Sequence, residues 1–323
     1  MTYVRMIRRF FMASAKPMPY STSRHKKMTR MAYTAVQAFY VVNLLFAYQT
    51  MYTLMDMYGD IRTPVTAVMP LWPVWFIDVP HFASAINIVS IAYMLASLFA
   101  VIKPDWRMAR LLLFVTILVV FALKYSFGFV KQKEIMWIWT SFIFIFLPSR
   151  SLSSVLESRP ARQYYLDIFA AAQGLVLFFY FLTGFWKVVY GIAALAMGNV
   201  IGMFSPSALA YMIHYKMLHE HTESFLGQFI HASTGFPLML WTVYIEFFAL
   251  WVWFRPSLHR LWGVMLILFH IGTWLVMGIP FYLQPPLLAI LLLQSPFVPE
   301  NSNWRNILCQ MPVIGWLFGR YVN

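Results

Sequence analysis

The sequence contains very little cysteine and few charged residues. Cys309 is the single cysteine in 323 residues, so the chain has no intrachain disulfide and no cysteine-based zinc or iron–sulfur site. Charged residues make up 11% of the chain, whereas a soluble domain has about 25%. The sequence also lacks an Asn-x-Ser/Thr sequon, an internal repeat and a low-complexity tract. These absences exclude an ordinary soluble domain, and nothing marks extracellular maturation.

Hydrophobic residues make up 61% of the chain and aromatic residues 19%, with a mean hydropathy of +0.67. A membrane-spanning helix needs about 17–25 apolar residues. Runs that approach or reach this length lie at Ala32–Leu54, Phe82–Ile102, Met108–Val130, Ile135–Leu147, Ile168–Tyr190, Pro237–Phe254, Leu261–Pro280 and Pro286–Phe297. The fourth run is short, and the eighth spans a membrane only if it is tilted or distorted. We therefore predict an integral membrane protein, an all-α polytopic transmembrane helical bundle of about eight spans.

The formal net charge is +13, and the first thirty residues contribute eight Lys and Arg without any Asp or Glu. We interpret residues 1–30 as a basic cytoplasmic tail that contacts anionic lipid headgroups, rather than as a nucleic-acid site. We expect the transmembrane domain at 31–298 and a short C-terminal tail at 299–323, with no large soluble C-terminal domain. The basic tail also resembles a transit peptide. A bacterial inner membrane is therefore our first expectation, and an organellar inner membrane with a matrix N-terminus is the alternative.

The distribution of positive charges predicts an N-terminus inside. In an eight-span topology of this orientation, the eight cations of the tail and ten later ones fall inside. Outside fall Arg62, Lys131, Lys133 and Lys216, while Lys124 and Lys187 lie within helices. Because cytoplasmic loops carry an excess of Lys and Arg, this asymmetry supports the orientation.

Five ionisable residues lie inside or at the rims of the predicted spans, and in this topology most fall in the outer half of the membrane. Lys187 is the most informative, because an ammonium near hydrocarbon must reach the interface, pair or meet water. It could simply extend to the outer interface, and Lys124 could extend or pair. Glu134 is expected to be a solvated loop charge, whereas Glu246 requires a partner or a wet cavity. His270 is expected to be neutral and bonded to a helix backbone.

Four of the eight histidines lie in the segment between the fifth and sixth runs, namely His214, His219, His221 and His231. His219 and His221 flank Glu220, and Glu223 follows. Two metal-binding histidines on one helix face are usually four residues apart, and no further ligand motif accompanies this pair. We therefore predict a polar loop and no metal site.

In the second half of the chain, the segment Phe179–Lys187 is followed by Glu246, Phe269-His270, Gly278–Tyr282, Gln294–Phe297 and Trp304-Arg305. In order and approximate spacing, these motifs resemble those of the vitamin K-dependent γ-carboxylase family and its bacterial relatives, the HTTM membrane domains. Phe179–Lys187 is similar to the Tyr-x-x-Ala-Gly-x-x-Lys segment of that family. The resemblance covers about residues 30–308, and it implies a carboxylase-like fold.

The resemblance implies a role for Lys187 as the base that acts on reduced vitamin K. In the family, the reduced quinone reacts with O₂ to form a strong base, which removes a γ-proton from glutamate before CO₂ adds. A histidine earlier in the chain assists the lysine. Here the corresponding stretch, Val130–Trp137, has no histidine, and the nearest polar residues are Gln132 and Glu134. A low-dielectric pocket suits a base lysine, because desolvation favours the neutral amine.

Three function hypotheses follow from these patterns. The first is a lyase-like enzyme that binds a quinol, with Lys187 as base, Glu246 and His270 shaping its pocket, and Glu134 in the helper position. Its quinone ring would lie against Trp186, Trp274 and Tyr282. The second is a non-catalytic subunit that uses the same fold to dock other membrane subunits. The third, a transporter, is disfavoured because neither broken helices nor inverted repeats are evident.

Overall fold

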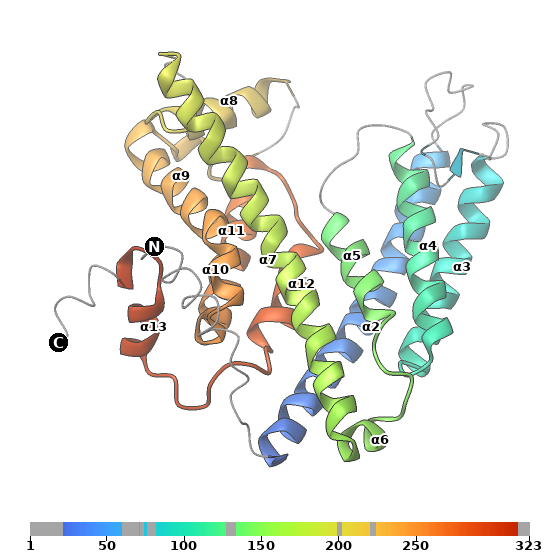
Figure 1. The fold of residues 1–323 in the computed structure, drawn as a ribbon. Coiled ribbons are helices and arrows are strands. Elements are labelled where there is room, and N and C mark those ends of the chain that lie inside the picture. Colours follow the sequence, from blue (N-terminus) through green and yellow to red (C-terminus); the bar gives the residue numbers. More distant parts are fainter. Residues whose placement is uncertain are drawn as a thin grey trace. The chain divides into compact units, whose positions relative to one another are not determined.

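A computed structural model describes residues 22–59, 71, 74–75, 82–126, 134–198, 202–219 and 224–315, and within these ranges all regular structure is helical. The chain divides into two compact units (Figure 1). We call Lys26–Ala172 the N-terminal unit. The C-terminal unit comprises Gln173–Asn323 together with Met1–His25.

Within the described ranges, five helices are long and apolar enough to cross a membrane, as in a multi-pass membrane protein. Their candidate spans are Thr22–Leu54, Ser84–Ile102, Arg107–Tyr125, Arg159–Ala196 and Pro256–Met277. Two other predicted spans form shorter apolar helices, Ile135–Phe144 and Gln284–Leu293. The remaining predicted span, Pro237–Phe254, is divided at Phe248 into two helices. The expectation of long apolar helices is therefore confirmed, and the count of eight crossings stays a prediction.

The N-terminal unit is built from helices that follow one another along the chain (Figure 1). These helices are α2 (Thr22–Gly59), α3 (Phe82–Ile102), α4 (Arg107–Tyr125), α5 (Ile135–Phe144), α6 (Leu152–Glu157) and the first part of α7 (Arg159–Ala196). Helix α4 packs against both α3 and α5. Before α7, the hydroxyl of Ser158 accepts a hydrogen bond from the backbone N–H of Ala161, which satisfies one of the free donors at a helix start.

A buried polar network connects three helices of the N-terminal unit. The side-chain carbonyl of Asn43 on α2 accepts hydrogen bonds from the Tyr93 hydroxyl at 3.0 Å and the Trp137 indole at 2.8 Å. The amide of Asn43 donates to the hydroxyl of Ser97 at 2.9 Å. All four residues are at most 1% exposed. Because an unpaired polar group is costly away from water, this network fixes the relative positions of α2, α3 and α5.

We expect Asn43→Ala to destabilise the N-terminal unit by at least the penalty of one unsatisfied buried group, about 1–3 kcal/mol. The substitution removes the acceptor of two buried donors while leaving both donors in place. Thermal unfolding of the purified protein in detergent measures the effect. As a control, Thr116→Val removes a hydroxyl that bonds to carbonyls of its own helix, and it should change stability by less than about 0.5 kcal/mol. Equal melting points for the two variants would contradict the role of the network.

The C-terminal unit contains the rest of α7 and the helices that follow it. These are α8 (Ala208–His219), η3 (Gly227–Phe229), α9 (Ala232–Phe247), α10 (Ala249–Trp253), η4 (Pro256–Leu258), α11 (His259–Met277), α12 (Gln284–Leu288), η5 (Ala289–Leu293) and α13 (Trp304–Gln310). Helix α11 contacts α8, α9, α10 and α12. It ends at Gly278, whose φ of 67° is the left-handed conformation that glycine adopts readily at a helix C-terminus.

The last apolar helix of the C-terminal unit contains a π-helical turn, η5, in which the backbone N–H of Gln294 donates to the backbone carbonyl of Ala289. Such turns occur mostly as short interruptions of α-helices and often lie at functional sites. Here the side-chain amide of Gln173 on α7 donates to the carbonyl of Leu291 at 2.5 Å and to the hydroxyl of Ser295 at 3.0 Å. These bonds attach α7 to η5 inside the unit.

Candidate functional site

Lys187 and Glu246 form an ion pair between α7 and α9. The Lys187 Nζ donates to Glu246 Oε2 at 2.5 Å, and the two side chains are 23% and 3% exposed, respectively. The ammonium also lies 5.7 Å from the centre of the Phe269 ring on α11, within the range of a cation–π interaction. We predicted that Glu246 needs a partner or a wet cavity, and its partner is Lys187. Lys187 is paired rather than simply extended toward the interface.

Gly184 allows α7 to approach α9 closely enough for this pair to form. A Cβ at Gly184 would lie 2.3 Å from the backbone nitrogen of Phe247 and 2.7 Å from the carbonyl carbon of Glu246. A backbone contact of this kind leaves no room for any other side chain. Gly184 lies three residues before Lys187, one turn away on the same helix face. The glycine thus determines the distance between the helices that carry the two charges.

A second pair, Tyr180 and His270, lies beside the first. The Tyr180 hydroxyl and His270 Nε2 are 2.5 Å apart, and both residues are 4% exposed. Among the residues that the structure describes, His270 Nδ1 has no hydrogen-bond partner. Lys187 is within electrostatic range of His270, and Glu246 is within range of Tyr180. The expectation that His270 bonds to a helix backbone is wrong, because its Nε2 is hydrogen-bonded to the hydroxyl of Tyr180 instead.

These four residues, which we call the Lys187 cluster, can move a proton without changing the net charge. Proton transfer from the ammonium to Glu246 converts the ion pair into a neutral amine and a neutral acid. If the Tyr180 hydroxyl donates to Nε2, the neutral imidazole carries its own hydrogen on Nδ1. That N–H would be a buried donor available to a bound oxygen. The cluster therefore combines a potential base with a potential hydrogen-bond donor.

The aromatic residues expected to bind a ring are exposed on the C-terminal unit. Trp186, Trp274 and Tyr282 are 52%, 54% and 62% exposed, respectively. Two other rings touch the cluster. Phe269 and Phe281 lie with their centres 5.0 and 4.8 Å from that of His270. Both rings belong to the quoted motifs, and the binding of a ring by Trp186, Trp274 and Tyr282 stays a prediction.

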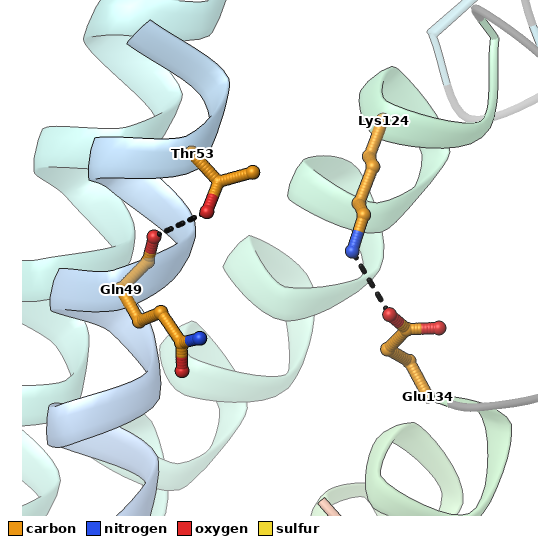
Figure 2. Close-up of polar contacts among 4 residues, drawn as sticks. All are labelled: Gln49, Thr53, Lys124 and Glu134. Carbon is orange, nitrogen blue, oxygen red and sulfur yellow. Dashed lines mark hydrogen bonds and ion pairs between the residues drawn. The ribbon is translucent and has the colours of Figure 1, made fainter. Parts of the chain in front are cut away.

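Glu134 belongs to the N-terminal unit, where it pairs with Lys124. Lys124 Nζ on α4 donates to Glu134 Oε1 at 2.9 Å, just before α5 begins (Figure 2). Glu134 is 7% exposed, so the expectation of a solvated loop charge is wrong. Its Oε2 has no partner within the described ranges. The neighbouring polar groups drawn in Figure 2 are Gln49 and Thr53 on α2, where the Thr53 hydroxyl donates to the Gln49 carbonyl at 3.0 Å.

Several buried polar residues of the C-terminal unit were not predicted from the sequence. Ser295 accepts from Gln173 and lies 2.7 Å from Nδ1 of His259, and all three residues are fully or almost fully buried. Tyr180 and Ser295 occur in motifs quoted from the sequence, but neither was given a role. These residues could have been found by the same signal that identified Glu246 and His270, namely a polar side chain within an apolar run.

No group of three potential metal ligands occurs among the described residues. Glu220, His221 and Glu223 lie outside them, as does the side chain of His219. Gln132, the other polar residue near the expected helper position, also lies outside. The comparison of this chain with family models, curated proteins and solved structures gives no match.

Proposed function

We propose that this chain is a γ-carboxylase-like, HTTM-type membrane enzyme that uses Lys187 as a base toward the hydroxyl group of a quinol or another lipophilic substrate. The observation that carries the proposal is the Lys187 cluster, in which three helices bring a lysine, a carboxylate, a histidine and a tyrosine together in an apolar unit. The motifs that contain Lys187, His270 and Phe281 support the family assignment.

Glu246 has a distinct role in this proposal, because it holds the proton that Lys187 must release before it can act. After that transfer, the neutral amine of Lys187 accepts the hydroxyl proton of the quinol. The products are a quinolate anion and an ammonium, with Glu246 still protonated. The adjacent ammonium then stabilises the quinolate electrostatically. Proton exchange inside the pair thus supplies a base without leaving an isolated charge in a low-dielectric site.

His270 and Tyr180 orient the substrate in this mechanism. The Nδ1–H of His270 donates to an oxygen of the bound quinol, while the Tyr180 hydroxyl fixes the tautomer through Nε2. Phe269 and Phe281 provide apolar faces next to the imidazole. No helper histidine is required at the start of α5, where Glu134 is already paired with Lys124.

The pairing of Glu134 favours a second candidate function, a non-catalytic subunit of a membrane complex. A carboxylate held by Lys124 in the N-terminal unit is a poor substitute for a neutral imidazole acting on Lys187. In either function we propose eight crossings with the N-terminus in the cytoplasm, or in the matrix of an organelle. The excess of Lys and Arg on one side supports this orientation.

Purification of the protein in native lipid, followed by extraction and mass spectrometry, separates the two functions. The enzyme proposal predicts a co-purifying lipophilic quinone whose amount falls at least tenfold in His270→Phe, which removes the proposed donor. Trp304→Phe, at an exposed residue of α13, is the control and should retain it. A stoichiometric membrane partner without a quinone would favour the subunit. Equal quinone retention by both variants would contradict the proposed role of His270.

A further inference from the structure

The N-terminal unit contains a cavity of about 790 Å³ that is separate from the Lys187 cluster and from the Lys124–Glu134 pair. It lies where α3 ends at Ile102 and α4 begins at Arg107, next to the turn after α5. The charge asymmetry predicts that this end of the unit faces the cytoplasm. Its volume falls within the range of about 300–1,000 Å³ that is common for small-molecule sites.

The polar lining of this cavity carries charges of both signs. Lys103 and Arg150 are exposed cations, whereas Asp105 is half-buried. Behind the lining, Arg110 is 2% exposed and donates through Nη2 to the hydroxyl of Ser149 at 3.1 Å. The Arg110 Nε has no partner within the part of the chain that the structure describes. A ligand with one negative and one positive group would therefore find complementary charges on the cavity wall.

Asp105 is well suited to receive a cationic group. Burial raises the pKa of its carboxyl, while a hydrogen bond from Tyr33 and the positive charge of Arg110 lower it to a smaller extent. The local cations and donors thus do not fully offset the cost of burying the carboxylate. A further positive group beside Asp105 would stabilise its ionised form.

The apolar part of the lining indicates a ligand that lies at a membrane surface. Phe99, at the end of α3, and Trp106, between the helices, are 49% and 47% exposed and lie with their ring centres 6.0 Å apart. Tryptophan is enriched at the level of lipid headgroups, where one end of the ring meets hydrocarbon and the other meets water. Basic pockets on the cytoplasmic side of membrane proteins are also common headgroup sites.

We propose that this cavity binds a phospholipid headgroup that carries both a phosphate and a primary ammonium, as phosphatidylethanolamine does. The phosphate lies toward Lys103 and Arg150, and the ammonium donates to Asp105. The glycerol and the first methylenes of the acyl chains lie against Phe99 and Trp106. This site differs in position and in headgroup charge from the anionic lipid contact expected of the basic tail.

The test is native mass spectrometry of the full chain, released from nanodiscs that contain equal amounts of phosphatidylethanolamine and phosphatidylglycerol. The wild-type protein should retain phosphatidylethanolamine in preference to phosphatidylglycerol. Asp105→Asn should reduce that retention about tenfold, the effect of losing roughly one charge-assisted hydrogen bond. Asp105→Glu should keep a measurable preference, which separates a lost contact from misfolding.

Two controls make the test specific. The double variant Lys103→Gln/Arg150→Gln should lose phosphatidylethanolamine, whereas Arg107→Gln removes a neighbouring exposed cation that does not line the cavity and should retain it. Free phosphoethanolamine should compete weakly, because it lacks the apolar contacts.

Equal retention of phosphatidylglycerol, or unchanged retention by Asp105→Asn, would overturn the proposal. If free phosphoethanolamine competed as effectively as the intact lipid, the role of the apolar contacts would be overturned. None of these outcomes depends on Lys187.

Discussion

Replacement of Lys187 by methionine is expected to lower the free energy of unfolding by about 3–5 kcal/mol, the usual cost of removing one partner of a buried ion pair. The substitution leaves the carboxylate of Glu246, whose side chain is 3% exposed, without its cation. The reverse variant, Glu246→Leu, should cost less, because the Lys187 side chain is 23% exposed and its ammonium can move toward the interface. The two partners are therefore energetically unequal.

The matched control for this prediction is the double variant Lys187→Met/Glu246→Leu. Two apolar residues of similar size remove both charges, and replacement of a whole buried pair is often neutral or stabilising. The double variant should therefore recover most of the stability that Lys187→Met loses. Reversible unfolding of the four proteins in one detergent gives the coupling energy through a double-mutant cycle. Additive effects of the two substitutions would show that the residues do not interact.

Gly184→Ala is expected to disrupt the same pair from a distance of one helical turn. The added methyl group would meet the backbone of α9, which cannot rotate away as a side chain can. Helices α7 and α9 must then separate, at a cost of about 1–3 kcal/mol for overpacking, and the Lys187–Glu246 contact lengthens with them. Quinone retention should fall together with the melting temperature.

Gly272→Ala provides a control within the same unit. Gly272 lies in α11, and a Cβ there would have no heavy atom within 4 Å apart from the helix itself and its chain neighbours. Alanine is favoured over glycine inside helices by about 1 kcal/mol, so this variant should be as stable as the wild type or more stable. Similar losses at the two glycines would contradict the interpretation that Gly184 permits a close approach of two helices.

The long apolar helices could be predicted from the sequence, because their composition leaves few alternatives. Phe82–Ile102 is an example, since the predicted span and α3 have the same bounds. The division of Pro237–Phe254 at Phe248 could not be predicted, because the apolar pattern continues through the break. Helix α7 also continues through Gly191 to Ala196, beyond the predicted end at Tyr190.

The candidate site was predictable in its residue types but not in its pairings. Lys187, Glu246 and His270 were identified because each is polar within an apolar run, and two of the three proved to be one ion pair. The pairing of Lys124 with Glu134 was missed, since it depends on how α4 and the start of α5 meet in space. Likewise, the bond between Tyr180 and His270 joins residues that are 90 positions apart in the sequence. Periodicity carries no information on such contacts.

The proposed role of Lys187 as the base that takes a proton from a quinol is tested most directly by the absorption spectrum of a bound quinol. A reduced naphthoquinone is titrated without oxygen into nanodiscs that contain the wild-type protein or the double variant Lys187→Met/Glu246→Leu. We predict that the wild-type protein yields the long-wavelength absorption of the quinolate at a pH where the free quinol is protonated. The double variant should yield the spectrum of the neutral quinol. Quinolate formation by both proteins, or by neither, would contradict the account.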